Sequence, residues 1–170
     1  AQCWKNLGAI FEFENNNQEA RNCYKIALQK HPDLMEAHFA LGLSLLNEGY
    51  PEEALTHLDQ VIWATDEVIH SVNARSHRLK IYFRLEETDK AFTEIATILP
   101  HSDQCQWVLP WCAQLVHNYV RTNSDAVPHA LRFWETYQRK APNDLEAQKE
   151  YLLCLAHAKM SGLSVPICLQ

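Results

Sequence analysis

A set of small and aromatic residues at fixed spacing fills the start of this chain. A Trp at position 4 is followed by a Leu-Gly pair, by a second aromatic residue at position 11 and by two alanines further on. The positions that define this pattern are Trp4, Leu7, Gly8, Phe11, Ala20, Tyr24, Ala27 and Pro32. Because a fixed period of 20 to 50 residues decides the architecture of a whole chain, the first question is whether this spacing returns.

The spacing does return, and the 170 residues correspond to five periods of about 34. The second copy consists of His38, Leu41, Gly42, Leu45, Ala54, Leu58 and Val61. The third and fourth copies are anchored by Tyr82, Ala91, Ile95 and Ile98, and by Ala130, Trp134, Tyr137 and Pro142. A fifth copy begins in DLEAQKEYLLCLAHAKM and lacks a long second half. We therefore expect one domain over 1–170, with repeats at 1–34, 35–68, 69–102, 103–142 and, in part, 143–170.

Each position of the first copy has a role in a helix-turn-helix unit. Trp4, Leu7 and Phe11 fall on one face of a helix, where we expect them to pack. Gly8 lacks a side chain at the point where the second helix comes close, and Tyr24 fills the space between the two helices. The stretches ENNNQ and NEGYPEE contain turn-forming residues between the helices. The pattern predicts pairs of antiparallel helices.

These residues match the tetratricopeptide repeat pattern, WxxLGxxY followed by AxxxF and Pro, with Phe and Tyr exchanged. The chain resembles the tetratricopeptide repeat (TPR) family over its whole length. The resemblance implies an all-α fold, a right-handed α-α superhelix of about four and a half helix-turn-helix units. It also implies that the first helix of each repeat lines a concave face. Proteins of this family commonly serve as protein interaction modules.

The later repeats depart from the pattern in two places. After the second repeat, we expect the next helix to begin about three residues late. In SDQCQWVLPWCAQLVHNYV, Ser102 or Asp103 is a candidate helix cap, and Pro110 is expected to kink or restart the helix. Trp107 and Trp111 are spaced as core residues, but a distortion at Pro110 would leave one of them facing solvent and make this region a second candidate contact surface.

Composition and charge narrow the classes of function. A net charge of −6 provides no cationic field for nucleic acid, and no apolar run is long enough to cross a membrane. We expect a soluble, intracellular protein from a reducing compartment such as the cytoplasm. The six cysteines are expected to be buried free thiols: Cys3, Cys23, Cys105, Cys112, Cys154 and Cys168. The chain begins without Met and ends at SVPICLQ within the pattern, which suggests a piece of a longer protein.

The resemblance also proposes binding residues, because peptide-binding TPR domains use fixed positions of the first helix in each repeat. Carried onto this chain, those positions include Glu36, Asn73, Ala113 and His117. The predicted partner-binding groove itself consists of Lys5, Phe39, Leu43, Lys80, Phe83, Arg84 and Arg121. Its apolar members would anchor a partner segment, and its cations would favour acidic residues. The alternative is that these side chains pack between helices or are solvated.

Other kinds of site find less support in the sequence. Lys5 matches part of a clamp for chaperone C-termini, but Ala9 and Ala40 replace its two asparagines. No CxxC or HExxH spacing indicates a metal site, and no phosphate-binding or nucleophile motif is present. Cys112 and His117 form the one candidate catalytic dyad, without an oxyanion stabiliser. We expect no enzyme activity, no catalytic residues, no cofactor and no metal.

Two functions therefore remain open. In the first, the groove binds a peptide or partner segment without catalysis. In the second, the chain is a structural spacer or self-association element of a larger protein, enzymatic or not, and its C-terminal end packs on further repeats or on another copy. We expect a protein or peptide partner rather than nucleic acid or a membrane.

Overall fold

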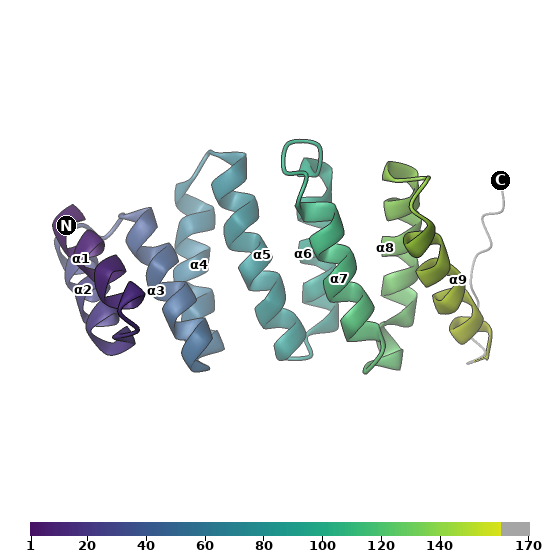
Figure 1. Ribbon diagram of the computed structural model, residues 1–170, viewed down its shortest axis with the longest axis horizontal. Coiled ribbons are helices and arrows are strands. Elements are labelled where there is room, and N and C mark those ends of the chain that lie inside the picture. Colours follow the sequence, from purple (N-terminus) through teal and green to yellow (C-terminus); the bar gives the residue numbers. More distant parts are fainter. Residues whose placement is uncertain (161–170) are drawn as a thin grey trace. The chain divides into compact units, whose positions relative to one another are not determined.

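The computed structural model describes residues 1–160, and these residues are helical, with no strand among them (Figure 1). The all-α fold class predicted from the sequence is confirmed. The end of the fifth repeat, including SVPICLQ and Cys168, lies outside the described residues. The α-helices are α1 (Gln2–Phe13), α2 (Asn17–Lys30), α3 (Met35–Glu48), α4 (Pro51–Ala64), α5 (Val68–Arg84), α6 (Thr88–Ile98), α7 (Val108–Val120), α8 (Val127–Lys140) and α9 (Leu145–Met160). Two 3-10 turns are η1 (Leu99–His101) and η2 (Ser124–Ala126).

The chain divides into two compact units, each with its own internal contacts. The N-terminal unit comprises residues 1–85 and the C-terminal unit begins at Glu86. In the N-terminal unit, each helix from α1 to α5 packs against the next (Figure 1). In the C-terminal unit, α8 contacts α6, α7 and α9. The division of the chain into five repeats stays a prediction.

The hairpin of α1 and α2 is built around Gly8 and Tyr24. Tyr24 is fully buried, and a Cβ atom on Gly8 would lie 2.5 Å from its ring. Ala20 and Ala27, on the same helix as Tyr24, are also fully buried. The predicted close approach at Gly8 is thus confirmed. Between the helices, Asn15 adopts a left-handed backbone with φ of 60°, a conformation that asparagine tolerates well.

The hairpin of α3 and α4 contributes much of the core of the N-terminal unit. Leu41, Leu45 and Leu58 are buried in it, and the same cluster includes the buried residues Tyr24 of α2 and Ile81 of α5. A Cβ on Gly42 would meet Leu58 at 3.4 Å, which is ordinary contact. Gly49 ends α3 with φ of 89°, where glycine is favoured, and Pro51 begins α4.

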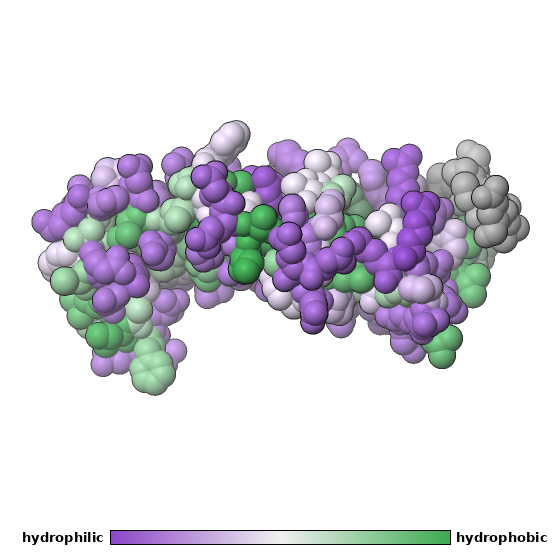
Figure 2. Space-filling view, turned by 90° about the horizontal axis from the view of Figure 1, so that it is seen from above, coloured by the Kyte–Doolittle hydropathy of each residue, from purple (hydrophilic) through white to green (hydrophobic). Residues whose placement is uncertain are grey.

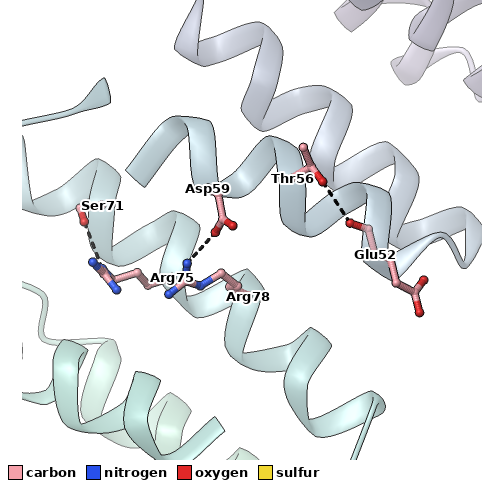
Figure 3. Close-up of polar contacts among 6 residues, drawn as sticks. All are labelled: Glu52, Thr56, Asp59, Ser71, Arg75 and Arg78. Carbon is pink, nitrogen blue, oxygen red and sulfur yellow. Dashed lines mark hydrogen bonds and ion pairs between the residues drawn. The ribbon is translucent and has the colours of Figure 1, made fainter. Parts of the chain in front are cut away.

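The helix α5 packs on α4 and is longer than the other helices of this unit. Arg78 of α5 donates a hydrogen bond to Asp59 of α4, while Arg75 donates to Ser71 within α5 (Figure 3). The expectation that this helix begins three residues late is wrong, since it starts at Val68 and spans 17 residues. The three additional residues are therefore taken up as almost one extra helical turn.

In the C-terminal unit, α8 provides three aromatic residues to the core. Phe133, Trp134 and Tyr137 are buried and their rings contact one another with centroids 4.9 to 6.0 Å apart. Pro128 lies in the first turn of α8, where proline is favoured. Pro110 lies in the first turn of α7, so this helix starts anew beside the proline, which was one of the two expected outcomes.

The expected cap of α7 is wrong. Ser102 and Asp103 precede a turn, and α7 begins only at Val108, with Trp107 at its N-cap and no side-chain hydrogen bond there. The chain folds into η1 directly after α6 because Leu99 is buried and Pro100 follows it at the first 3-10 turn. This turn and the loop after it occupy the residues that the sequence pattern placed in the helix.

Candidate functional site

The predicted groove positions of α3 and α5 lie side by side in the N-terminal unit. The ring of Phe39 on α3 contacts His77 on α5 edge to face, with centroids 5.6 Å apart. Further along the same helices, the Arg84 guanidinium donates a hydrogen bond of 3.4 Å to the carbonyl oxygen of Leu46. The two helices therefore present one continuous face.

A pocket of about 320 Å³ opens between α3, α4 and α5 beside Phe39. Its lining consists of Met35, Glu36, Phe39, Val61, His70 and Asn73. Three of these residues, Glu36, Phe39 and Asn73, were carried over from the family as groove positions. His70, on α5, was not among the predicted groove positions. The structure thus brings predicted groove positions from two helices to one pocket.

The remaining predicted groove residues are distributed over three helices. Leu43 is half-buried on α3, Lys80 and Phe83 are half-buried on α5, and Arg84 is exposed at the end of α5. Lys5 is half-buried on α1, which contacts α3. All of these residues belong to the N-terminal unit, so the predicted set falls in one compact body with a single exception.

The exception is Arg121, which lies in the C-terminal unit. It is exposed and forms the C-cap of α7. The structure does not bring it together with the groove residues of the N-terminal unit. A cation at the C-terminal end of a helix is favoured by the helix dipole, which gives Arg121 a local role.

Burial lowers the pKa values of two histidines around this face. The ring of His77 contacts Phe39, and its pKa is lowered to about 4 by burial and, secondarily, by the positive charge of Lys80. The pKa of His57 on α4 is also lowered, first by burial and then by His38, whose ring nitrogen lies 2.9 Å from its own. At neutral pH both side chains are therefore uncharged, which suits a site for apolar groups.

A second pocket, of about 270 Å³, lies in the C-terminal unit between α7 and α9, which are the first helices of the fourth and fifth predicted repeats. Its walls include Ala113 and His117 on α7 and Glu146 and Glu150 on α9, with Trp134 beneath. His117 pairs with Glu150 at 2.9 Å. Ala113 and His117 were also groove positions carried over from the family. This pocket is more acidic than the one beside Phe39.

The aromatic pair on α7 is only partly in the core. Trp107 and Trp111 contact each other edge to face at 6.0 Å, and Trp107 remains 41% exposed. The exposure of one tryptophan at Pro110 was an expected consequence of a break in the helix there. Trp107 therefore lies at the surface, on the N-cap of α7.

The first helix departs from expectation, because its predicted packing face is partly open. Trp4 and Leu7 are each 36% exposed, whereas Phe11, the third residue of that face, is half-buried and packs against the core cluster. Among the described residues, α1 contacts α2 and α3 and no helix precedes it, so one side stays uncovered. Figure 2 shows hydrophobic residues at the surface of this end of the chain.

The cysteines give little sign of reactivity. Cys23, Cys105, Cys112 and Cys154 are buried free thiols, as predicted, whereas Cys3 is exposed and the prediction is wrong there. Burial raises the pKa of Cys112 to about 12, so the thiol of the candidate dyad stays protonated at neutral pH.

Two further kinds of site were sought in the described part of the chain. In residues 1–160, no group of three or more His, Cys, Asp or Glu side chains is placed to hold a metal ion. None of the helices there combines the length and the apolar character needed to span a membrane.

Similarity to known proteins is stronger in structure than in sequence. No family model matches the chain. A segment of 55 residues, 32% of the chain, is 40% identical to the peroxisomal targeting signal receptor of Candida albicans. The match spans only 9% of that receptor.

Solved structures match over nearly the whole chain. The MamA protein superposes with a TM-score of 0.70 at 14% identity, covering 95% of this chain and 84% of MamA. A tetratricopeptide repeat protein from Parabacteroides merdae gives a TM-score of 0.63 at 18% identity, covering 96% of this chain and 65% of that protein. At these identities the similarity concerns the fold. The chain has the all-α helical-repeat fold of tetratricopeptide repeat proteins.

Proposed function

We propose that the chain is a non-catalytic interaction module and that the N-terminal unit binds a peptide or partner segment on the face of α3 and α5. The observation that carries this proposal is the pocket of about 320 Å³ beside Phe39, walled by Glu36 and Asn73. Pockets of this size beside an aromatic residue suit a single apolar side chain, and such anchors supply much of the affinity of an interface.

The charged residues on the face of α3 and α5 suggest which residue types the partner segment carries. Lys80 and Arg84 lie on α5, beyond the pocket, and Arg84 reaches the carbonyl oxygen of Leu46. From Phe39 to Leu46 the helix advances about 10 Å, at 1.5 Å per residue. An extended partner spans this length with about three residues. We therefore propose a segment with an apolar anchor and, about three residues away, an acidic side chain.

The similarity to the Candida albicans protein is consistent with this proposal. By its name, that protein is a receptor for a targeting signal. Because the matched segment is a small part of the receptor, its ligand is not transferred to this chain.

The proposal is tested by comparing Phe39→Ala with Ile62→Ala in affinity capture from a lysate. Both residues are partly buried and pack against the same core cluster, but only Phe39 lines the pocket. A partner lost by Phe39→Ala and kept by Ile62→Ala would support the groove. Equal capture by the two variants would refute it. Circular dichroism and light scattering control for fold and assembly.

Charge reversal tests the proposed acidic residue of the partner. Lys80→Glu with Arg84→Glu should weaken capture, while Lys25→Glu with Lys30→Glu, which makes the same change of charge on exposed residues of α2, should not. Loss of capture with both pairs would show that net charge, rather than this face, governs binding.

A second function, self-association through the C-terminal end, has its own support in α9. Leu145, Leu152 and Leu153 are 77%, 63% and 55% exposed. Large exposed apolar residues on one helix favour contact with another protein surface. If this helix mediates self-association, Leu152→Glu with Leu153→Glu should reduce the mass measured by light scattering. An unchanged monomeric mass in both proteins would exclude self-association.

A further inference from the structure

A further pocket lies in the C-terminal unit, and none of the predicted groove positions lines it. It has a volume of about 720 Å³ and is formed by α6, η1 and α8. These helices are second helices of their predicted repeats, whereas the groove was expected on first helices. The volume falls within the range of about 300–1,000 Å³ that is typical of ligand pockets.

The shape of this pocket follows the helices that wall it. On α6 and η1 the lining extends from Asp89 to Pro100, and on α8 from His129 to Lys140. Each range covers 12 residues, whose first and last Cα atoms are about 16 Å apart along a helix. The pocket is therefore an elongated groove, which we call the α6–α8 groove. A groove about 16 Å long matches about three turns of a partner helix.

The floor of the α6–α8 groove is apolar. Ile95, Leu99 and Phe133 are buried along it, and Ala96 is exposed at its centre. The hydroxyl groups that line the groove are already engaged by their own helices. Thr93 donates to the carbonyl oxygen of Asp89, and Thr136 to that of Arg132. Apolar side chains of a partner can thus enter without leaving these hydroxyls unpaired.

The rim of the groove is mainly basic. Arg132 is exposed midway along α8, and Lys140 lies at the end of α8, 3.6 Å from the highly exposed Asp103. Asp89, the acidic residue of the lining, lies at the opposite end and pairs with His129 at 3.3 Å. Exposed ion pairs of this kind contribute little energy, so a partner carboxylate can compete for Lys140. Charge complementarity therefore favours an acidic partner.

We propose that the α6–α8 groove binds an acidic amphipathic helix of a protein partner. The apolar face of that helix, with residues at i, i+3 or i+4, and i+7, lies on Ile95, Ala96 and Phe133. Its carboxylates pair with Arg132 and Lys140. This surface is distinct from the face of α3 and α5 in the N-terminal unit, so the chain holds two binding surfaces of different character.

The test uses the full chain and a fluorescently labelled peptide of about three helical turns, with leucines along one face and glutamates beside them. A matched peptide carries lysines in place of the glutamates, and a third has its leucines scattered around the helix. Fluorescence anisotropy should show binding of the glutamate peptide. Each control peptide should bind at least about tenfold more weakly. Binding of the glutamate peptide should also weaken as salt is added.

Two pairs of variants locate the binding. Arg132→Glu should weaken binding of the glutamate peptide by about tenfold, whereas Arg139→Glu, an exposed residue of the same helix outside the lining, should have a much smaller effect. Ala96→Trp should fill the groove and abolish binding, whereas Thr97→Trp, on the adjacent exposed residue outside the lining, should not.

Several outcomes would overturn the proposal. The first is equal binding of the lysine peptide, and the second is an equal effect of the two members of either variant pair. The third is no binding of the glutamate peptide at a concentration of about 1 mM. Phe39→Ala should leave peptide binding to this groove unchanged. A result here therefore neither supports nor refutes the proposed function of the N-terminal unit.

Discussion

The two units fill the space between paired helices in different ways. In the N-terminal unit, Gly8 and Gly42 leave room on the first helix, and Tyr24 and Leu58 fill it from the second. In the C-terminal unit, α7 contains no glycine and its Val116 is fully buried. The side chains that fill the space between paired helices thus differ in size from one hairpin to the next.

This difference extends to the partner helix. The buried residues of α2 are one tyrosine and small residues, whereas α8 buries Phe133, Trp134 and Tyr137 together. A larger residue on the first helix and three rings on the second separate the helix axes further, and α1 and α2 approach each other more closely than α7 and α8 do. Each hairpin is therefore close-packed by its own combination of side chains.

The largest expected effect comes from removing the central ring of the aromatic trio. Trp134 is 97% buried, contacts Phe133 and Tyr137, and hydrogen-bonds the Cys154 thiol of α9. Trp134→Ala should lower the free energy of unfolding by about 3–5 kcal/mol, because the cavity cannot be refilled by neighbours. Urea denaturation followed by circular dichroism measures this change. A loss below about 1 kcal/mol would mean that the trio is not what holds α8 in place.

A methyl group at Gly8 tests the close approach in the N-terminal unit. Alanine favours a helix over glycine by about 1 kcal/mol, but its Cβ would lie 2.5 Å from the buried Tyr24 ring. The clash should dominate, and Gly8→Ala should destabilise the protein by about 1–3 kcal/mol. Thermal denaturation measures the difference.

Gly42→Ala is the matched control for this substitution. Its new Cβ would lie 3.4 Å from Leu58, which is ordinary contact, so the change should be neutral or slightly stabilising. If Gly8→Ala were also neutral, α1 and α2 would be able to move apart enough to accommodate the new Cβ atom. The two units would then differ in the residues between their paired helices but not in how closely those helices must pack.

Much of this fold could be predicted from the sequence, because helix pairing depends on a few local features. The spacing of Gly8 and Tyr24 indicated their contact, and Gly49, Pro51 and Pro128 marked helix ends through backbone preferences. The exposure of Trp4 could not be predicted, since it depends on whether another helix covers α1. Periodicity shows that a residue faces a neighbour but not that the neighbour is present.

The candidate sites were predictable to different degrees. The carried-over positions Glu36, Phe39 and Asn73 do meet at a pocket, whereas His70 was missed because its role depends on how α5 lies against α3. The α6–α8 groove gave no recognisable signal. The spacing of Arg132 and Thr136 is that of any solvated helix face, and only the distance between α6 and α8 turns this face into the wall of a groove.

A change of pH should act on the N-terminal unit through His77. Burial and Lys80 lower its folded-state pKa to about 4, below the ordinary value of 6.5. The neutral ring therefore contributes stability that is fully present above pH 6.5 and is lost as the pH falls from 6.5 toward 4. The unfolding midpoint in urea should decrease over this range, and His77→Gln should make the decrease smaller. An identical decrease in both proteins would assign the effect to other groups.

The smallest effect should be shared by the two units, since each contains a tyrosine hydroxyl that donates to a carboxylate. Tyr24 donates to Glu12 and Tyr137 to Asp144, both at 2.8 Å. Tyr24→Phe and Tyr137→Phe should each lower the free energy of unfolding by about 0.5–1.5 kcal/mol, because both carboxylates are only partly buried and can be hydrated instead. Urea denaturation at neutral pH measures both. Equal values would show that the units share this bond despite their different cores. A much larger loss for Tyr24→Phe would show that the close hairpin of α1 and α2 depends on the hydroxyl as well as on the ring.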